Sequence, residues 1–317
     1  MRFDRVLVTG GAGFIGSHTV DALLQHGASV WVLDDLSTGS LRNLRVWKTN
    51  RKLHFRRGST IQANLVAALT KRVDAVIHLA AIVSPFYSVK KPEVVNAANV
   101  NGTLNVLNSC VKAQTQKFVF ASSSSVYGDQ VHLPIAEENP LCPITPYGAS
   151  KLSGEKYCGA YNRTYGLSTI ALRYFNVYGE RQSSNPYSGV IAIFSKQLRR
   201  GLQPKIFGDG MQTRDFIHVS DVVQANLQAL NANSGTGDAF NVGTGRPISI
   251  NELSSIQAKL VNKVEITPIH ALARAGDIKD SYADITRAKQ VLGFQSKMDL
   301  EQGLMALVNT ISKRDAK

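Results

Sequence analysis

The first half of the chain alternates between apolar runs of strand length and segments of helix length. The strand-like runs are RVLVTG (5–10), SVWVLDD (29–35), DAVIHLAA (74–81), KFVFASS (117–123) and LSTIALRYF (167–175). The helix-like segments are FIGSHTVDALLQHG (14–27), residues 94–113 and YGASKLSGEKYCGAYNRTYG (147–166). Continuous apolar strands separated by helices are typical of a parallel sheet covered on both faces. We therefore predict an α/β fold built on a doubly wound parallel sheet.

The second half is less regular. It contains a predicted loop, a strand-like run and four predicted helices: NVYGERQSSNPYSGV (176–190), KIFGDG (205–210), and helices near 190–201, 220–232, 250–261 and 300–312. We interpret residues 1–175 as the sheet domain and 176–317 as a smaller mixed α/β domain, with part of 216–245 packing back on the first. No repeat or low-complexity linker separates them, so we expect a ligand to bind between the two.

Composition supports a globular enzyme-sized protein. The 317 residues are 44% apolar and 19% charged, which is enough to bury a substantial core. No apolar run reaches the ~18 residues of a membrane span, and the chain opens on a strand pattern without a signal-peptide core, so we predict a cytoplasmic location. Cys110, Cys142 and Cys158 match neither a disulfide framework nor a zinc site, and we expect no metal.

The formal net charge of +13 is unevenly distributed. Between Leu36 and Val73 there is no Asp or Glu, whereas nine Lys and Arg residues fall there. A nucleic-acid or acidic-membrane patch is one interpretation. Because no nucleic-acid motif accompanies these residues, we favour a solvated face suited to a polyanionic small ligand, and we expect no nucleic-acid or membrane partner.

A glycine-rich turn follows the first strand. In VLVTGGAGFIGS, Gly10 allows the tight turn, Gly13 allows close approach of a pyrophosphate, and Gly16 allows helix and strand to pack closely. The following helix N-terminus offers N–H groups and a positive dipole end. The second strand ends in Asp34, whose carboxylate can accept hydrogen bonds from ribose hydroxyls and would repel a 2′-phosphate. This Rossmann fingerprint predicts NAD as the cofactor.

A tyrosine and a lysine share one helix face further along. Tyr147 and Lys151 lie four residues apart in PYGASKLSGEKY, directly after Pro146. Tyrosine is a poor base near neutral pH, but an adjacent ammonium and a cationic nicotinamide ring would both favour its phenolate. Tyr147 could then accept a proton from a sugar hydroxyl while hydride leaves.

These motifs, with long blocks in the same order, resemble the extended short-chain dehydrogenases/reductases, specifically the nucleotide-sugar 4-epimerase family typified by UDP-glucose 4-epimerase. The blocks are TGGAGFIGS, VLDDLSTG, VIHLAA, NVNGTLNVL, SSSSVYGD, YGASK, LRYFNVYG, GDGMQTRDFIHVSDV, NVGTG and RAGDIKDSYADITRAKQVLGF. The resemblance covers nearly the whole chain. It implies a tightly bound, recycled NAD and a UDP-sugar substrate.

The resemblance also assigns roles residue by residue. It implies that Tyr147 is the base, that Lys151 binds the nicotinamide ribose, and that Ser123 hydrogen-bonds the reacting 4-hydroxyl. The implied cofactor-binding residues are Gly10, Gly13, Phe14, Ile15, Gly16, Asp34, Asp35, Leu36, Ser37, Gly39, Ser59, Thr60, Leu79, Ala80, Ala81, Val83, Asn99, Tyr147, Lys151 and Phe175. The implied substrate-binding residues are Ser123, Tyr147, Asn176, Lys205, Phe207, Arg214, Arg274, Asp277 and Ser281.

Two short segments carry information beyond the shared motifs: the first departs from the family pattern, and the second distinguishes between reaction types within the family. Gly58-Ser59-Thr60 replaces the usual Gly-Asp-Ile, whose Asp reaches the adenine amino group, so looser cofactor binding is an expected consequence. Related dehydratases and decarboxylases resemble Thr-Asp-Glu and Thr-Ser-Glu before Val-Tyr-Gly. Here Ser124 and Ser125 stand in that place, and hydroxyls lack the proton-transfer capacity of carboxyls.

The resemblance therefore implies epimerisation: oxidation at C4, rotation of the 4-keto sugar while the UDP stays anchored, and hydride return to the other face. Ser281 falls at the position where the family pattern of enzymes restricted to glucose and galactose has a bulky tyrosine. A small side chain there leaves room for a 2-acetamido group, so we expect UDP-GlcNAc and UDP-GalNAc to be accepted as well as UDP-Glc and UDP-Gal. A UDP-glucuronate 4-epimerase or decarboxylase stays open, since Arg181 or Lys279 could meet a carboxylate. A non-catalytic dinucleotide sensor is the competing class. A homodimer through helices 94–113 and 147–165 rests on the resemblance alone.

Overall fold

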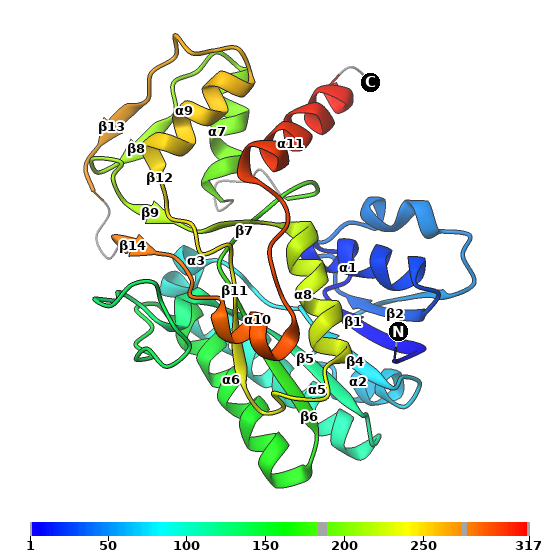
Figure 1. Ribbon diagram of the computed structural model, residues 1–317. Helices are drawn as coiled ribbons and strands as arrows, with labels where there is room; N and C mark the ends of the chain where they lie inside the picture. The colour runs from blue at the N-terminus through cyan, green and yellow to red at the C-terminus, as the bar shows by residue number, and fades with distance from the viewer. Residues whose placement is uncertain (1, 183–188, 274–277, 316–317) are drawn as a thin grey trace.

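The computed structural model describes residues 2–182, 189–273 and 278–315 and centres on one parallel sheet (Figure 1). Its seven strands lie in the order β11-β6-β5-β4-β1-β2-β3, and every neighbouring pair is parallel. The strands are β1 (Arg5–Thr9), β2 (Ser29–Asp34), β3 (Leu53–Arg57), β4 (Ala75–His78), β5 (Lys117–Ser123), β6 (Ser168–Tyr174) and β11 (Ala239–Val242). The predicted doubly wound fold is confirmed.

Two separate apolar cores explain why the central strands are apolar on both faces. Helices of one core are α1 (Phe14–Gln25), α8 (Val219–Asn231) and α10 (Thr286–Leu292). Helices of the other are α2 (Ala63–Thr70), α5 (Gly102–Lys112) and α6 (Pro146–Tyr165). Every residue of β4 and β5 is buried, because neither strand has a face in contact with water. Two short helices, α3 (Pro85–Lys90) and α4 (Pro92–Asn96), and a π-helical turn, η2 (Ala97–Asn101), precede α5.

The apolar pattern misses several elements of this layer, among them β3, α2 and β11. Strand β3 is the edge of the sheet, and its residues alternate between half-buried and exposed, with Arg56 and Arg57 in contact with solvent. An edge strand with charged residues gives no continuous apolar run. Strand β11 comes from residues 239–242, so the segment 216–245 supplies both α8 and a strand to the sheet layer.

The remaining elements form a smaller layer that lies above the sheet in Figure 1. They are β7 (Asn176–Tyr178), α7 (Val190–Arg199), β8 (Lys205–Phe207), β9 (Thr213–Arg214), β10 (Phe216–His218), β12 (Ile248–Ser249), α9 (Ile250–Leu260), β13 (Ile269–Ala271), β14 (Asp280–Ser281) and α11 (Leu300–Asp315). Their apolar side chains form a third core around Phe194, Ile206 and Leu253. Strand β7 forms inside a segment predicted as a loop, because it pairs with β10.

One buried carboxylate holds the two layers together. Asp215, between β9 and β10, is fully buried and accepts hydrogen bonds from the Thr244 N–H (2.8 Å), the Thr244 hydroxyl (2.6 Å) and the Gly245 N–H (2.9 Å). The Ala283 N–H is a fourth donor at 3.2 Å. Because Thr244 follows β11 and Ala283 follows β14, this single side chain connects the sheet to the smaller layer.

We predict that Asp215→Asn lowers the free energy of unfolding by about 1–3 kcal/mol, since one oxygen becomes a donor facing buried N–H groups. Urea unfolding of the two proteins measures the difference. The matched control is Asp209→Asn, because Asp209 is exposed and its side chain bonds only the nearby Met211 N–H. Equal losses in both variants would contradict the role given to Asp215.

Candidate active site

The glycine-rich turn between β1 and α1 has no room for side chains. Gly10 has a φ of +70°, and a Cβ there would lie 2.8 Å from the Ala80 nitrogen. A Cβ at Gly16 would collide with the Gly10 carbonyl oxygen. Gly13 is the N-cap of α1, no side chain caps this helix, and its first turn has no acidic residue. The first-turn N–H groups of Phe14 and Ile15 therefore suit a pyrophosphate.

Asp34 lies beside this turn at the end of β2. Its carboxylate accepts hydrogen bonds from the Ala12 N–H (2.9 Å) and the Leu36 N–H (2.8 Å). Burial raises the pKa of Asp34, and these hydrogen bonds act in the opposite direction. A Cβ at Gly39 would lie 2.8 Å from the same carboxylate, so Gly39 keeps space next to it. The neighbouring Asp35 and Ser37 are exposed, and the Ser37 N–H donates to Asp35 Oδ1.

The departure at Ser59-Thr60 lies in the loop after β3. The Ser59 N–H donates to Gln62 Oε1 at 2.9 Å, and Ser59 is half-buried. Thr60 is buried, with its side chain against Gly102 and its carbonyl oxygen accepting from Asn105. Of the two hydroxyls, only that of Ser59 therefore has access to a ligand at this end of the sheet.

The end of β4 contributes the loop Leu79-Ala80-Ala81, which faces the glycine turn. The Leu79 N–H donates to the Thr9 carbonyl (3.1 Å), and the Ala80 N–H donates to the Thr9 hydroxyl (3.3 Å). Asn99 holds the next part of this loop, because its amide bonds both the N–H and the carbonyl of Ile82. Val83 is 63% exposed and lies at the rim.

Sequence reasoning missed a buried polar chain behind this loop. His78 Nδ1 lies 2.7 Å from the Thr9 hydroxyl, and His78 Nε2 lies 2.9 Å from the Thr103 hydroxyl. Thr103 then donates to the carbonyl of Asn99, inside the π-helical turn η2. Burial lowers the pKa of His78 to about 3, so the ring is neutral. The available signal was a histidine within an apolar strand, and π-helical turns are frequent at functional sites.

Strand β5 and helix α6 bring the three predicted catalytic residues together. Helix α6 begins at Pro146, with Thr145 as its N-cap, and both Tyr147 and Lys151 are buried on its inner face. The Lys151 ammonium donates to the carbonyl of Ala121 at 2.8 Å. Ser123, the last residue of β5, lies close enough to Tyr147 to act on the pKa of its phenol. The geometry thus places a hydroxyl, a phenol and an ammonium at the carboxyl end of a central strand.

Burial sets the protonation of the pair. It raises the pKa of Tyr147 to about 12, although the hydrogen bond from Ser123 acts in the other direction. Burial also lowers the pKa of Lys151 to about 8. We expected the ammonium to favour the phenolate, but desolvation is the larger effect here and keeps Tyr147 a neutral phenol.

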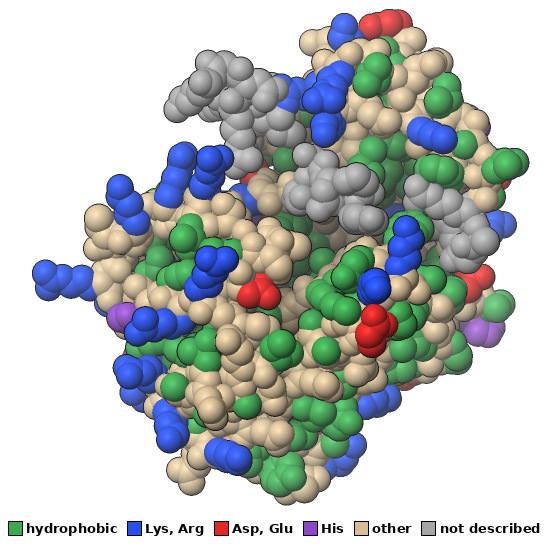
Figure 2. Space-filling view, turned by 180° about the vertical axis from the view of Figure 1, so that it is seen from behind, with side chains coloured by type: hydrophobic (Ala, Val, Ile, Leu, Met, Phe, Trp, Pro, Cys, Tyr) green, Lys and Arg blue, Asp and Glu red, His purple; other side chains and the backbone are tan. Residues whose placement is uncertain are grey.

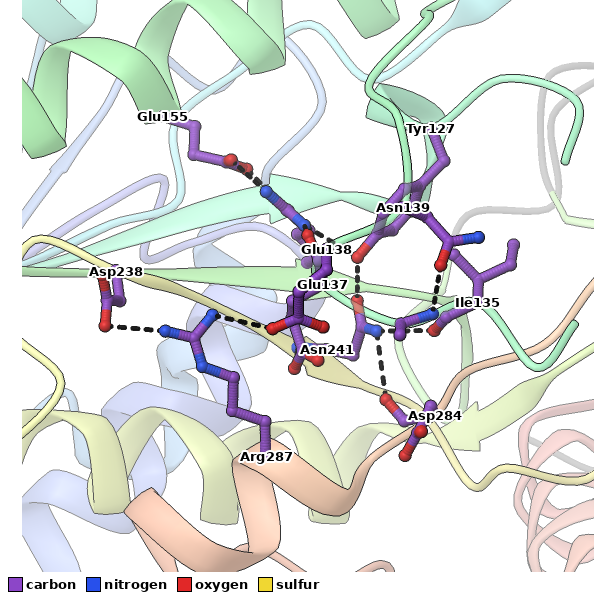
Figure 3. Close-up of polar contacts among 12 residues, drawn as sticks. Tyr127, Ile135, Glu137, Glu138, Asn139, Glu155, Asp238, Asn241, Asp284 and Arg287 are labelled. Atoms are coloured by element: carbon purple, nitrogen blue, oxygen red, sulfur yellow. Dashed lines mark hydrogen bonds and ion pairs between the residues drawn. The ribbon is translucent and has the colours of Figure 1, made fainter. Parts of the chain in front are cut away.

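A buried ion pair connects α6 to β6, and sequence reasoning missed it. Glu155 lies one turn after Lys151, accepts from the Ser122 hydroxyl (2.9 Å) and pairs with Arg173 of β6; the two side chains are 6% and 5% exposed. Arg173 also donates to the Tyr127 hydroxyl (2.8 Å), which donates to Asn241 (2.6 Å) (Figure 3). A carboxylate four residues after a buried lysine was the sequence signal.

The predicted substrate-binding residues fall into separate groups. Phe175 is buried against Tyr127, with ring centroids 6.5 Å apart, and the Asn176 N–H donates to the Asp215 carbonyl. Arg214 and Ser281 lie opposite each other on β9 and β14. Lys205 and Phe207 contact each other on β8, which belongs to a different small sheet. Arg274 and Asp277 lie outside the described residues.

Comparison with known proteins identifies the family. The model of the NAD dependent epimerase/dehydratase family matches residues 6–243, and the chain belongs to this family. Among relatives, a putative UDP-glucose 4-epimerase of Methanocaldococcus jannaschii is 42% identical over 306 residues, covering 96% of this chain and 97% of the relative. The predicted resemblance and the predicted NAD cofactor are confirmed. Among the described residues, no cluster of His, Cys, Asp or Glu could hold a metal ion.

Two solved structures are similar over their full length. A UDP-glucose 4-epimerase of Thermotoga maritima with UDP-glucose is 39% identical, covers 98% of this chain and 99% of its own, and has a TM-score of 0.93. A UDP-N-acetylglucosamine 4-epimerase of Methanobrevibacter ruminantium, in complex with UDP-N-acetylmuramic acid, is 36% identical with coverages of 99% and 100% and a TM-score of 0.94.

The lowered pKa of Lys151 predicts a pH-dependent stability. Between about pH 8 and 10.5 the unfolded chain holds this proton and the folded chain does not, so the contribution of Lys151 to the stability of the wild type rises with pH. We expect the difference in unfolding free energy between the wild type and Lys151→Met to shift by about 3 kcal/mol in favour of the wild type across this window. Urea unfolding at several pH values measures it. Lys156→Met, which removes an exposed ammonium from the same helix, is the control, and a flat Lys151 difference would contradict the prediction.

Proposed function

We propose that the protein catalyses NAD-dependent C4 epimerisation of UDP-hexoses, acting on UDP-Glc and UDP-Gal and also on UDP-GlcNAc and UDP-GalNAc. The observation that carries the proposal is the convergence of Ser123, Tyr147 and Lys151 at the end of β5, beside the glycine turn. The similarity to proteins named as UDP-sugar 4-epimerases supports the same reaction.

The residues present fit NAD. Gly10 and Gly16 cannot accept a Cβ, the N-terminus of α1 is uncapped, and Asp34 presents a carboxylate beside it. When bound, NAD supplies a hydride acceptor at C4 and then the hydride donor. Asp34 would bind the adenosine ribose and Lys151 the nicotinamide ribose, while Asn99 keeps the loop after β4 in place. Ser59 would replace the usual acidic contact to adenine.

The protein side chains would handle the proton of the 4-hydroxyl. Ser123 would hold the hydroxyl by a hydrogen bond and orient it towards Tyr147. Tyr147 would accept the proton through its phenolate, and the same phenol would return it to the 4-oxygen after the 4-keto sugar has rotated. A phenolate needs a lower pKa than the value of about 12 set by burial, so the charge of the bound nicotinamide must outweigh desolvation.

The hydroxyls before Val-Tyr-Gly favour epimerisation over dehydration. Ser124 and Ser125 form a 3-10 turn after β5, and the Ser123 hydroxyl donates to the Ser125 hydroxyl at 3.1 Å. A serine therefore lies next to the reacting position where an elimination would require a carboxyl group. Epimerisation requires no such group.

We predict that Tyr147→Phe lowers kcat by about a thousandfold or more, because the proton acceptor is lost. Calorimetric titration with UDP should show that nucleotide binding is retained. Tyr157→Phe, which removes an exposed phenol from the same helix, is the matched control and should keep its activity. Full turnover in Tyr147→Phe would disprove the mechanism.

The small side chain at Ser281 supports acceptance of 2-acetamido sugars. Ser281 is buried, and its carbonyl oxygen accepts from the Asp215 N–H, so β14 is held next to Arg214. Arg214, together with Asn176, would bind the UDP part, with Arg274 and Asp277 as further proposed contacts. Lys205 and Phe207 would line the far side of the site.

We expect Ser281→Tyr to lose UDP-GlcNAc and UDP-GalNAc turnover by about 10–200-fold relative to UDP-Glc and UDP-Gal. The assay is a panel of these four sugars and UDP-GlcA, followed for C4 inversion without added cofactor. Ser281→Ala is the control that keeps the site open. Unchanged N-acetyl activity in Ser281→Tyr would reject the assignment, and turnover of UDP-GlcA alone would favour the glucuronate alternative.

We also propose a homodimer and a cytoplasmic location. On the helices expected to pair, Val94, Tyr157 and Tyr165 are 38–57% exposed, and on the preceding helix α3 Phe86 and Val89 are 53% and 65% exposed. Such exposed apolar side chains are typical of a subunit interface. Every helix in the described part of the chain is too short or too polar to span a bilayer.

A further inference from the structure

The outer edge of the sheet is strongly basic. It consists of β3 and the 3-10 helix η1 (Leu41–Trp47), and seven cationic side chains on it are exposed. We call this surface the basic edge and define it by Arg42, Arg45, Lys48, Arg51, Lys52, Arg56 and Arg57. β2 lies at the right of Figure 1, and this side of the molecule is at the left of Figure 2, where many Lys and Arg side chains are exposed. The basic edge thus contains seven of the nine Lys and Arg residues of the acid-free segment between Leu36 and Val73.

Helix η1 presents its cations in a row. Side chains three apart align in a 3-10 helix, so Arg42, Arg45 and Lys48 lie along one side. The opposite side is anchored: Leu44 is buried, and Trp47 Nε1 donates to Asp21 at 2.8 Å. The row therefore sits on a fixed part of the fold rather than on a loose loop.

Aliphatic side chains are exposed next to these cations. On η1 itself, Val46 is 74% exposed and Leu41 50%. None of the seven cations forms an ion pair with another described residue, although Lys52 donates to the Gly27 carbonyl. Positive charge on an edge strand discourages strand pairing, which accounts for Arg56 and Arg57. It accounts neither for the η1 row nor for the exposed aliphatic groups.

We propose, in place of the solvated face without a membrane partner that the sequence led us to expect, that the basic edge is a docking surface for anionic lipid bilayers. Cations attract the negative surface of such a membrane, and exposed aliphatic side chains can enter its interfacial layer. Single-stranded nucleic acid fits less well, because it requires free aromatic faces for base stacking. Among the described residues of this edge, Trp47 and Phe55 pack against the sheet core, and the ring centroids of Trp31 and His54 are stacked 4.4 Å apart.

Docking is independent of the proposed reaction. The basic edge lies on η1 and β3, whereas Ser123, Tyr147 and Lys151 lie on β5 and α6, and three strands separate β5 from β3 in the sheet. The surface would lie on a membrane and not within it. A bound enzyme would release its product close to reactions that occur at that membrane.

The test is flotation of the full chain with vesicles of phosphatidylcholine, with and without phosphatidylglycerol. We expect binding only with the anionic lipid, weakening as salt increases. The triple variant Arg42→Gln, Arg45→Gln, Lys48→Gln should bind about a hundredfold more weakly, at about fivefold per charge. Val46→Ser should bind severalfold more weakly. Epimerase activity in solution, assayed separately, should be unchanged in both variants.

The matched control is the triple variant Lys112→Gln, Lys259→Gln, Lys289→Gln, which removes the same net charge from exposed positions elsewhere. It should keep most of its vesicle binding. Equal losses in both triple variants would show attraction by net charge alone and overturn the proposal. No binding to anionic vesicles, or binding to single-stranded RNA that depends on the same three cations, would also overturn it.

Discussion

The contact between α6 and the last three residues of β5 determines the geometry of the whole site. Consecutive positions of the strand meet residues on one face of the helix: Ala121 and Ser122 are hydrogen-bonded to Lys151 and Glu155, and Ser123 acts on the pKa of Tyr147. A shift of the helix along the strand would break all three contacts together. The candidate catalytic side chains are therefore held in place by the packing of α6 in the core that it shares with α2 and α5.

Buried polar groups elsewhere extend this principle. The ion pair of Glu155 with Arg173 is almost fully desolvated, and such a pair is costly unless every polar atom finds a partner. Arg173 meets this condition by also bonding Tyr127 and the carbonyl of Glu137. The chain from Thr9 through His78 to Asn99 acts in the same way on the cofactor side. Both networks connect strands to loops that must keep their shape at the ends of the sheet.

Burial also decides the charge state of the site. Desolvation raises the pKa of Tyr147 and lowers that of Lys151, so the protein without ligands favours a neutral phenol. Under the proposed mechanism, activation of the tyrosine then depends on the positive charge that arrives with the cofactor, and no phenolate forms until the cofactor is in place.

The sequence by itself determined the sheet, the glycine turn and the Tyr-Lys pair, because apolar periodicity and local spacing are properties of neighbouring residues. It did not predict β3 and β11, whose pairing depends on distant strands, nor Glu155, Arg173 and His78, whose partners are far away in the chain. The raised pKa of Tyr147 is likewise a consequence of tertiary burial, which local spacing does not contain. The sequence already places seven cations between residues 42 and 57, but the tertiary structure alone decided that all seven are exposed while Leu44 and Trp47 pack against the core, since only folding sets which side chains face the solvent.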